Sequence, residues 1–212
     1  MNYTELEQKL GKQTKSDWHQ ASGGGWIHKN AKVENEDNIR DSAIVMSNAR
    51  VSGNARVYGN ARVIGNARVY DDARVYDDAW VSGNALVSGN AEVSGNVVVS
   101  GNAWVYGDAK VTGNAVVFGS AWVYGDAKVT GNAEVTGNAK VYGNARVFGD
   151  AVVTGNARVF GSAWVYGNAR VSGDAVVSGN AMVYGNARVF GNAEVTGNAR
   201  VSDDAEVSGN KE

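Results

Sequence analysis

The sequence Ala55-Arg56-Val57-Tyr58-Gly59-Asn60 is followed at once by Ala61-Arg62-Val63-Ile64-Gly65-Asn66, and this six-residue pattern continues without insertion from residue 43 to residue 210. An aliphatic residue stands at every sixth position from Ile27 to Val207. Ala precedes it by two positions from Ala31 to Ala205, except at Asp37 and Val97. A strict period of this kind indicates a repeat architecture and outranks weaker local signals.

Each hexapeptide has the composition of a short strand followed by a corner. Ala and Val stand two positions apart, so they point to the same side of an extended chain, and the residues flanking Val point to the other side. The Gly-Asn pair that follows tolerates a positive φ angle and can bend the chain. The polarity of the pattern never reverses, which argues against hairpins. The pattern therefore predicts a coil that turns in one direction.

Three hexapeptides complete one triangular turn of such a coil. Each strand then pairs in parallel with the strand three hexapeptides later, and the Val and Ala side chains fill the interior. Units of this kind are stable only when they are stacked on their neighbours. The sequence thus predicts an all-β solenoid over residues 27–210, with about ten turns and a length of roughly 50 Å.

The spacing of an aliphatic residue and a small residue four positions later, as in Val57 with Ala61, resembles the hexapeptide-repeat family. The resemblance covers most of the chain and implies a left-handed parallel β-helix; the period alone leaves a right-handed coil open. The stretch from Ser22 to Ile27 is similar to the start of the uncharacterised YdcK-like β-helix proteins of bacteria and phages.

Residues 1–26 lack the repeat and are predicted to form a cap segment. Thr4 with Glu7 fits a capping box at the start of a short helix from about Glu5 to Leu10, and Gly11 would end it. The helix is too short to be stable alone, so it must dock on the open first turn. Residues 28–42 keep the spacing but lose the consensus, which predicts an irregular first turn.

Composition excludes several classes of protein. The 212 residues include no Cys and no Pro and carry a net charge of −2, so disulfides, thiolate metal sites and a nucleic-acid-binding surface are not expected. The N-terminus lacks the apolar core of a signal peptide and no stretch has transmembrane length. We expect no cofactor, no membrane partner and a cytoplasmic location, in a bacterium or in a phage-infected cell.

Counting by 18 sorts the outward residues into three faces. The first, which we call the aromatic face, is the best candidate site and consists of Trp104, Tyr106, Trp122, Tyr124, Tyr142 and Phe160. The second is basic, from Arg56 to Arg200, with Glu92, Trp164 and Met182 between. The third is the least distinctive, with Val98, Val116 and Val152 beside Ser and Thr. Exposed aromatic residues often serve recognition, although stacked rings also stabilise neighbouring strands without any partner.

The best-known activity in the hexapeptide-repeat family is acyl transfer, which by resemblance uses a His as general base near a subunit boundary. This chain has only His19 and His28, both outside the regular coil, and no loop interrupts the repeats. A surface His without a paired carboxylate is more often structural than catalytic. We therefore expect no catalytic residue and keep an acyltransferase as the alternative function.

Two further site types receive little support. The pairs Asp71-Asp72 and Asp77-Asp78 lie on successive corners, so the coil separates them, and Asp108 with Asp126 suggests at most weak cation binding. Ice binding requires long ranks of Thr on one flat face, but Thr112 with Thr130 and Thr136 with Thr154 are the only adjacent pairs. Ice binding is the minor alternative, and a metal site is not predicted.

The sequence favours a non-enzymatic scaffold or binding module that presents flat faces. By resemblance, self-association is the leading partner interaction, since hexapeptide-repeat proteins are commonly trimers packed along their faces. The repeats continue to Asn210, with no cap in the sequence, so end-to-end stacking or a separate protein partner is also compatible with the chain.

Overall fold

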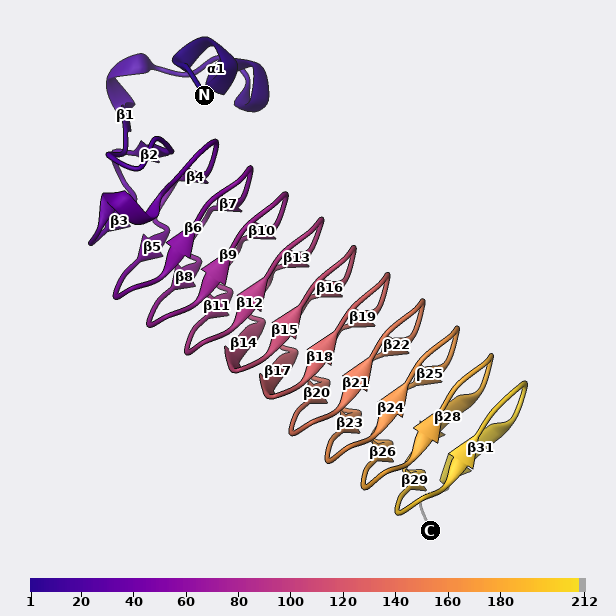
Figure 1. The fold of residues 1–212 in the computed structure, drawn as a ribbon. Helices are drawn as coiled ribbons and strands as arrows, with labels where there is room; N and C mark the ends of the chain where they lie inside the picture. Colours follow the sequence, from indigo (N-terminus) through magenta and orange to yellow (C-terminus); the bar gives the residue numbers. More distant parts are fainter. Residues whose placement is uncertain (210–212) are drawn as a thin grey trace.

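One strand per hexapeptide and three strands per turn build a parallel β-solenoid of about ten turns, shown in Figure 1. The structure is a computed structural model that describes residues 1–209. The strands form three sheets, one along each side of the coil, and each strand pairs in parallel with the strand one turn later, as Val105 does with Val123. The predicted all-β solenoid is confirmed; the left-handed coil implied by the resemblance stays a prediction.

Within residues 1–209, sheet I has twelve strands. They are β1 (Trp18–Gln20), β2 (Trp26–His28), β4 (Ile44–Val45), β7 (Arg62–Val63), β10 (Trp80–Val81), β13 (Val98–Val99), β16 (Val116–Val117), β19 (Glu134–Val135), β22 (Val152–Val153), β25 (Arg170–Val171), β28 (Arg188–Gly191) and β31 (Glu206–Gly209). The predicted last residue of the coil, Asn210, lies outside the described residues.

Sheet II has ten strands over the same range, namely β3 (Lys32–Val33), β5 (Arg50–Val51), β8 (Arg68–Val69), β11 (Leu86–Val87), β14 (Trp104–Gly107), β17 (Trp122–Gly125), β20 (Lys140–Val141), β23 (Arg158–Val159), β26 (Val176–Val177) and β29 (Glu194–Val195). Sheet III has nine described strands, namely β6 (Arg56–Val57), β9 (Arg74–Val75), β12 (Glu92–Val93), β15 (Lys110–Val111), β18 (Lys128–Val129), β21 (Arg146–Val147), β24 (Trp164–Val165), β27 (Met182–Val183) and β30 (Arg200–Val201).

The interior is filled by the Val and Ala columns that the period predicted. From Ala43 to Val195 these side chains are buried, and most have no exposed surface, as at Val105 and Ala109. Nearly every interior position receives the same side chain at every level, so successive turns repeat one another. We use level for the three strands, one from each sheet, that make up one turn.

The corner glycines are required by both conformation and space. Gly107 has a φ of 74°, and a Cβ atom there would lie 3.0 Å from the backbone nitrogen of Gly125 one turn later. Where Asp replaces the glycine, its side chain compensates: Asp71 has a φ of 62°, and its carboxylate accepts a hydrogen bond of 3.1 Å from the N–H of Gly89. Asp and Asn tolerate this left-handed region better than other residues with a Cβ.

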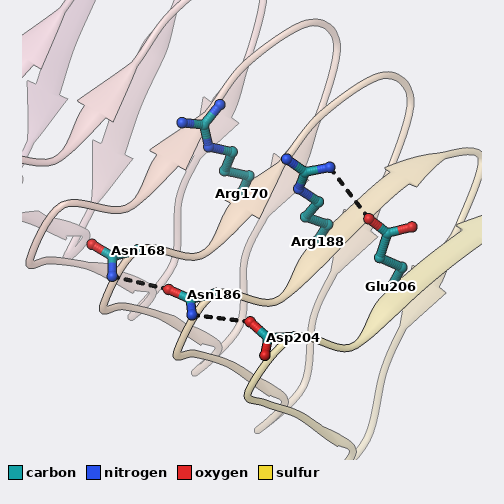
Figure 2. A pocket seen from close by; sticks show the side chains of 6 residues that line it. All are labelled: Asn168, Arg170, Asn186, Arg188, Asp204 and Glu206. Carbon is teal, nitrogen blue, oxygen red and sulfur yellow. Dashed lines mark hydrogen bonds and ion pairs between the residues drawn. The ribbon is translucent and has the colours of Figure 1, made fainter.

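The second corner position carries columns of Asn whose side chains bond to one another. In each column the amide Nδ2 of an Asn donates to the side-chain oxygen of the residue one turn later; Figure 2 shows the run from Asn168 through Asn186 to Asp204. An ionised Asp accepts but cannot donate. Each described run that reaches an Asp accordingly ends there, at Asp72, Asp78, Asp108, Asp150, Asp174 and Asp204.

The N-terminal segment folds partly as predicted. The helix α1 (Tyr3–Leu10) begins two positions earlier than expected, because Asn2 is the N-cap and forms the capping box with Glu5. The predicted box of Thr4 with Glu7 is therefore wrong. Asn2 is as good a cap as Thr, and its side chain accepts from the Glu5 N–H at 3.0 Å. Gly11 ends the helix, as predicted.

The cap covers the first turn in two ways. The strand β1 pairs antiparallel with β2 and so occupies the first open edge of sheet I. The helix α1 lies over the outer side of the same sheet, where Leu6 packs with Trp18, Trp26 and Ile44 in a small cluster separate from the main core. The 3₁₀ turn η1 (Lys15–Asp17) lies within the cap segment, and a second 3₁₀ turn, η2 (Glu36–Asn38), follows it in the chain. The turn η2 lies within the irregular first turn predicted for residues 28–42.

None of the helices in residues 1–209 has the length and apolar character needed to cross a bilayer.

Candidate functional site

The aromatic face lies along the middle of sheet II. Trp104 on β14 and Trp122 on β17 are in direct register, and their rings stack with centroids 5.0 Å apart and planes within 5°. The stacking follows from the sequence, because the stretches from Trp104 to Ala115 and from Trp122 to Ala133 are identical and begin three hexapeptides apart. One full turn separates them, so identical side chains fall directly on one another.

A second column of rings runs beside the two Trp residues at the edge of the sheet. Tyr106, Tyr124, Tyr142 and Phe160 stack at successive centroid distances of 4.8 Å. The Tyr106 ring meets both Trp rings edge-on at 6.5 Å. The structure thus brings together all six residues predicted for the aromatic face. Because the rings stack face to face within each column, they present mainly their edges to solvent.

Burial and neighbouring charge shape the electrostatics of this surface. Desolvation raises the pKa of the Tyr106 hydroxyl, and it also raises the pKa of Tyr124, where the neighbouring Tyr106 and Tyr142 add to the effect. The Lys140 ammonium lies 4.6 Å from the Trp122 ring centroid and closes the C-terminal end of the Trp column by a cation–π contact. The aromatic face is therefore an uncharged surface with a cation at one end.

Sheet I carries exposed aromatic residues that the sequence interpretation missed. Trp80 on β10 is 42% exposed and Phe118, which follows β16, is 53% exposed. The view of the third face as the least distinctive is therefore wrong for its middle turns. The count by 18 places Trp80 in one column with Val98 and Val116, and that column was the signal that could have identified this surface.

Sheet III is basic, as expected, and has an aromatic cluster of its own. Phe148, Tyr166 and Tyr184 stack in one column, and Trp164 meets the first two edge-on. The Arg146 guanidinium lies 5.1 Å from the Trp164 ring. Cations lie directly on cations at Lys110 and Lys128. The aromatic cluster and the surrounding positive charge make this side unlike sheets I and II.

The two histidines differ in their surroundings. His19 has a carboxylate partner that the sequence did not indicate: its Nε2 lies 2.9 Å from the Glu36 Oε1, and the two side chains are 51% and 40% exposed. The pair joins β1 to η2. His28 instead packs edge-on against Trp18 at 5.0 Å. The partner of His19 could not be read from the sequence, because it lies in the irregular turn where the period fails.

The remaining candidates do not gather into sites. Within residues 1–209, His, Asp and Glu form no group of three or more suited to a metal ion. Thr136 donates to Thr154 at 3.0 Å on sheet I, whereas Thr112 and Thr130 follow strands of sheet III. The Thr pairs therefore do not combine into the broad flat rank that ice binding needs.

An open depression of about 460 Å³ lies near the C-terminal end of the coil, and Figure 2 shows the side chains that line it. Arg170 and Arg188 line it in adjacent strands, and Arg188 pairs with Glu206 at 3.3 Å. The Asn168–Asn186–Asp204 run forms its other wall. The acidic side chains offset the two guanidinium groups, so the depression has no strong preference for an anion.

The comparison with protein families follows from this geometry. A family model described as the YdcK beta solenoid repeat matches residues 49–65, 55–69, 67–83, 91–107, 139–155, 153–167, 163–179 and 175–191. The fold and these matches define a β-solenoid repeat protein. The matched repeats are similar to those of the YdcK type, in agreement with the predicted resemblance. No curated protein sequence matches the chain.

Two solved structures share a weaker likeness. The UDP-N-acetylglucosamine acyltransferase of Francisella novicida is 14% identical with a TM-score of 0.41, covering 80% of this chain and 62% of that one. The UDP-N-acetylglucosamine acyltransferase of Arabidopsis is 13% identical with a TM-score of 0.35, covering 73% and 67%. This chain thus spans less than two thirds of the Francisella enzyme. Likeness at this level says nothing about what this chain binds or catalyses.

Proposed function

We propose that the chain is a non-enzymatic β-solenoid scaffold or binding module, and that the aromatic face is its contact surface for a second copy of the chain. The observation that carries the proposal is the exposed, uncharged pair of aromatic columns on a flat sheet. Trp104 remains 40% exposed although it stacks on Trp122. Large exposed apolar patches on soluble proteins are typical of interaction sites.

The arrangement of the rings favours a protein partner over a sugar or a nucleobase. Sugars and bases bind aromatic residues through the ring faces, and the faces in these columns lie against one another at 4.8–5.0 Å. The edges that remain form a flat, rigid surface. A flat surface of this kind is suited to packing against another flat surface, and the sides of this coil are such surfaces.

The test is the mass in solution, measured by light scattering over a range of concentrations. The wild type should associate, and the double variant Trp104→Ser/Trp122→Ser should shift to the monomer. The matched control is Tyr58→Ser/Tyr76→Ser, which removes an equally stacked pair from sheet III and should leave the mass unchanged. A wild type that is monomeric throughout the range contradicts the proposal of self-association.

An acyltransferase is the second candidate, and the pair of His19 with Glu36 is the observation that favours it. A carboxylate beside an imidazole orients the ring and supports a general base. The alternative role of the pair is to hold β1 against η2 at the surface, where such pairs contribute little to stability. Acyl-coenzyme A should raise the melting temperature of an enzyme, and His19→Ala should abolish acyl transfer while His28→Ala should not. A melting temperature unchanged by acyl-coenzyme A eliminates this candidate.

A further inference from the structure

The end of the helix α1 and the first regular turns of sheet I border an open depression of about 440 Å³. The residues that line it are Lys9 from α1, Asn60 and Asp78 from two successive corners, and Arg62 and Trp80 from β7 and β10. Pockets that bind small molecules have volumes of about 300–1,000 Å³ and combine apolar surface with a few polar groups. This depression has both kinds of group, contributed by two separate parts of the chain.

Arg62 has surroundings unlike those of every other Arg in residues 1–209. Its side chain is half-buried, whereas the others are exposed, including Arg68 and Arg74 at the same level. Its guanidinium forms no hydrogen bond or ion pair with another described residue. It lies 5.7 Å from the centroid of the Trp80 ring. A guanidinium carries several N–H donors, so the depression contains a cation whose donors remain available to an anion.

Asn60 lies between the other two charged residues and bonds to both. Its Oδ1 accepts a hydrogen bond of 3.0 Å from the Lys9 Nζ, and its Nδ2 donates one of 3.1 Å to the Asp78 Oδ1. Neither Lys9 nor Asp78 forms an ion pair within the described part of the chain. Two cations and one carboxylate therefore line the depression, which gives it a net charge of +1.

Trp80 supplies the apolar surface of the depression and is 42% exposed. Val98 and Val116 occupy the same column at the next two levels. Because a Val serves the strand equally well at those levels, the coil does not require an indole at position 80. Exposed Trp residues that the fold does not require often serve recognition.

The second Arg–Trp pair of the coil provides a comparison. Arg146 lies 5.1 Å from the Trp164 ring on sheet III, but Arg146 is exposed. Trp164 also packs edge-on against Phe148 and Tyr166. Trp80 has no aromatic partner of this kind among the described residues. Only at Trp80 does the cap segment border the pair, so that a ligand there would touch both α1 and the coil.

We propose that this depression binds a small aromatic monocarboxylate. The carboxylate lies between Arg62 and Lys9, where the planar guanidinium can donate two parallel hydrogen bonds. The ring of the ligand packs against the exposed part of Trp80. A single negative charge matches the net charge of the site, and the Asp78 carboxylate disfavours a second one. The proposal does not depend on self-association, because these residues belong to α1 and sheet I, whereas the aromatic face belongs to sheet II.

Phenylacetate is the probe, because it joins one carboxylate to one aromatic ring. Each of two matched probes lacks one of these groups: phenylacetamide has no charge, and acetate has no ring. Binding is followed by NMR through the indole N–H signal of Trp80, which is assigned by its absence from Trp80→Val. Phenylacetate should bind with a Kd on the order of 1 mM, as expected for about ten non-hydrogen atoms in an open site. Phenylacetamide and acetate should each bind at least about tenfold more weakly.

Substitutions test each group of the site, with the Kd measured from the signals of the ligand. Arg62→Gln and Trp80→Val should each weaken phenylacetate binding at least about tenfold. Lys9→Gln should weaken it about threefold, because the Lys9 side chain is exposed. The matched controls are Arg68→Gln, at the same level on sheet II, and Trp164→Val on sheet III, and both should leave the Kd unchanged. Circular dichroism checks the melting temperature of each variant.

Two results would overturn the site. One is a Trp80 indole signal that does not shift with phenylacetate up to about 30 mM, far above the expected Kd. The other is binding that persists in both Arg62→Gln and Trp80→Val, which would place the ligand elsewhere on the molecule. Equally strong binding of phenylacetamide or acetate would overturn the proposed class of ligand. None of these results depends on the mass in solution, so the test of the aromatic face and the test of this site can fail separately.

Discussion

At the scale of single residues, the interior of the coil tolerates almost no variation. Each Val and Ala repeats the environment of the residues one turn before and after, and Val105 is fully buried between its counterparts. A polar group placed there would have no hydrogen-bond partner, since its neighbours are all aliphatic. The same side chain placed outward would meet only solvent and neighbouring surface residues.

Val105→Asp should therefore unfold the middle turns. A buried carboxylate without a partner destabilises a protein by about 3–5 kcal/mol, which exceeds the stability that a few turns supply. The measurement is thermal and urea unfolding followed by circular dichroism. Thr112→Asp, at a half-buried outward position, is the matched control and should change stability by less than about 1 kcal/mol. Unchanged melting of Val105→Asp would contradict the inward Val column.

At the scale of the strand and its corner, hydrogen-bonded columns of Asn hold successive turns in register. Direction matters in these columns, because every described bond runs from an Asn amide to the residue one turn later. An ionised Asp in the middle of a column can accept a hydrogen bond from the residue one turn earlier, but it cannot donate one to the residue one turn later. An Asp at the C-terminal end of a run only has to accept a hydrogen bond, so no bond is lost there.

Asn84→Asp should accordingly destabilise the coil, while Asn102→Asp should be close to neutral. Asn84 accepts from Asn66 and donates to Asn102, whereas Asn102 is the last residue of its run. The loss of one side-chain hydrogen bond at an exposed corner is worth about 0.5–1 kcal/mol. Urea unfolding of both variants provides the comparison. Equal effects of the two substitutions would show that the direction of donation is unimportant.

The Tyr column should make stability depend on alkaline pH. Burial raises the pKa of Tyr106 and Tyr124 in the folded chain, so the folded state holds these protons more tightly than the unfolded state does. Their contribution is complete below pH ~10, the pKa of an unperturbed Tyr, and is lost as the pH rises through the raised pKa values. Urea midpoints at pH ~9 and ~11, on either side of that value, measure the loss. Tyr106→Phe/Tyr124→Phe should reduce the alkaline decrease, and an identical decrease in wild type and variant would refute its origin in these residues.

The regular part of the fold could be predicted from the sequence because one physical signal, the period, determines it. Strand positions, the direction of Val105 and the stacking of Trp104 on Trp122 all follow from counting by 18. The same count groups the six residues of the aromatic face. The count by 18 fails in the N-terminal residues, where the repeat is absent or irregular. The N-cap at Asn2 rather than Thr4 and the pairing of His19 with Glu36 depend on local competition and on irregular chain geometry.

At the scale of the whole molecule, the coil is a one-dimensional stack in which each turn contacts mainly its two neighbours. Stability in such a stack is roughly a sum of terms for single turns and for the interfaces between them. The identical stretches from Trp104 to Ala115 and from Trp122 to Ala133 make two of these turns nearly interchangeable. A turn can therefore be removed without creating a new junction in the sequence.

Deletion of residues 104–121, three whole hexapeptides, should leave a folded coil that is one turn shorter. Ala103 would then precede Trp122, as it now precedes Trp104. The urea m-value should fall by roughly a tenth, in proportion to the surface lost. Deletion of residues 104–112 is the control: it removes one and a half hexapeptides, so outward side chains would be forced inward. A coil that survives both deletions equally would contradict the strict register.

Because each turn has three sides, the position of a residue in the sequence determines on which side of the coil it lies. Removal of a single hexapeptide, such as residues 115–120, would leave the Val and Ala interior unchanged, because the spacing of six is kept. Every later residue would nevertheless rotate by one side of the coil, and Trp122 would leave the column of Trp104 for that of Val98. A deletion therefore preserves the interior if its length is a multiple of six residues. It preserves the columns on the surface only if its length is a multiple of 18 residues. A single deletion of this kind can therefore rearrange the surface columns of such a coil while its Val and Ala interior stays intact.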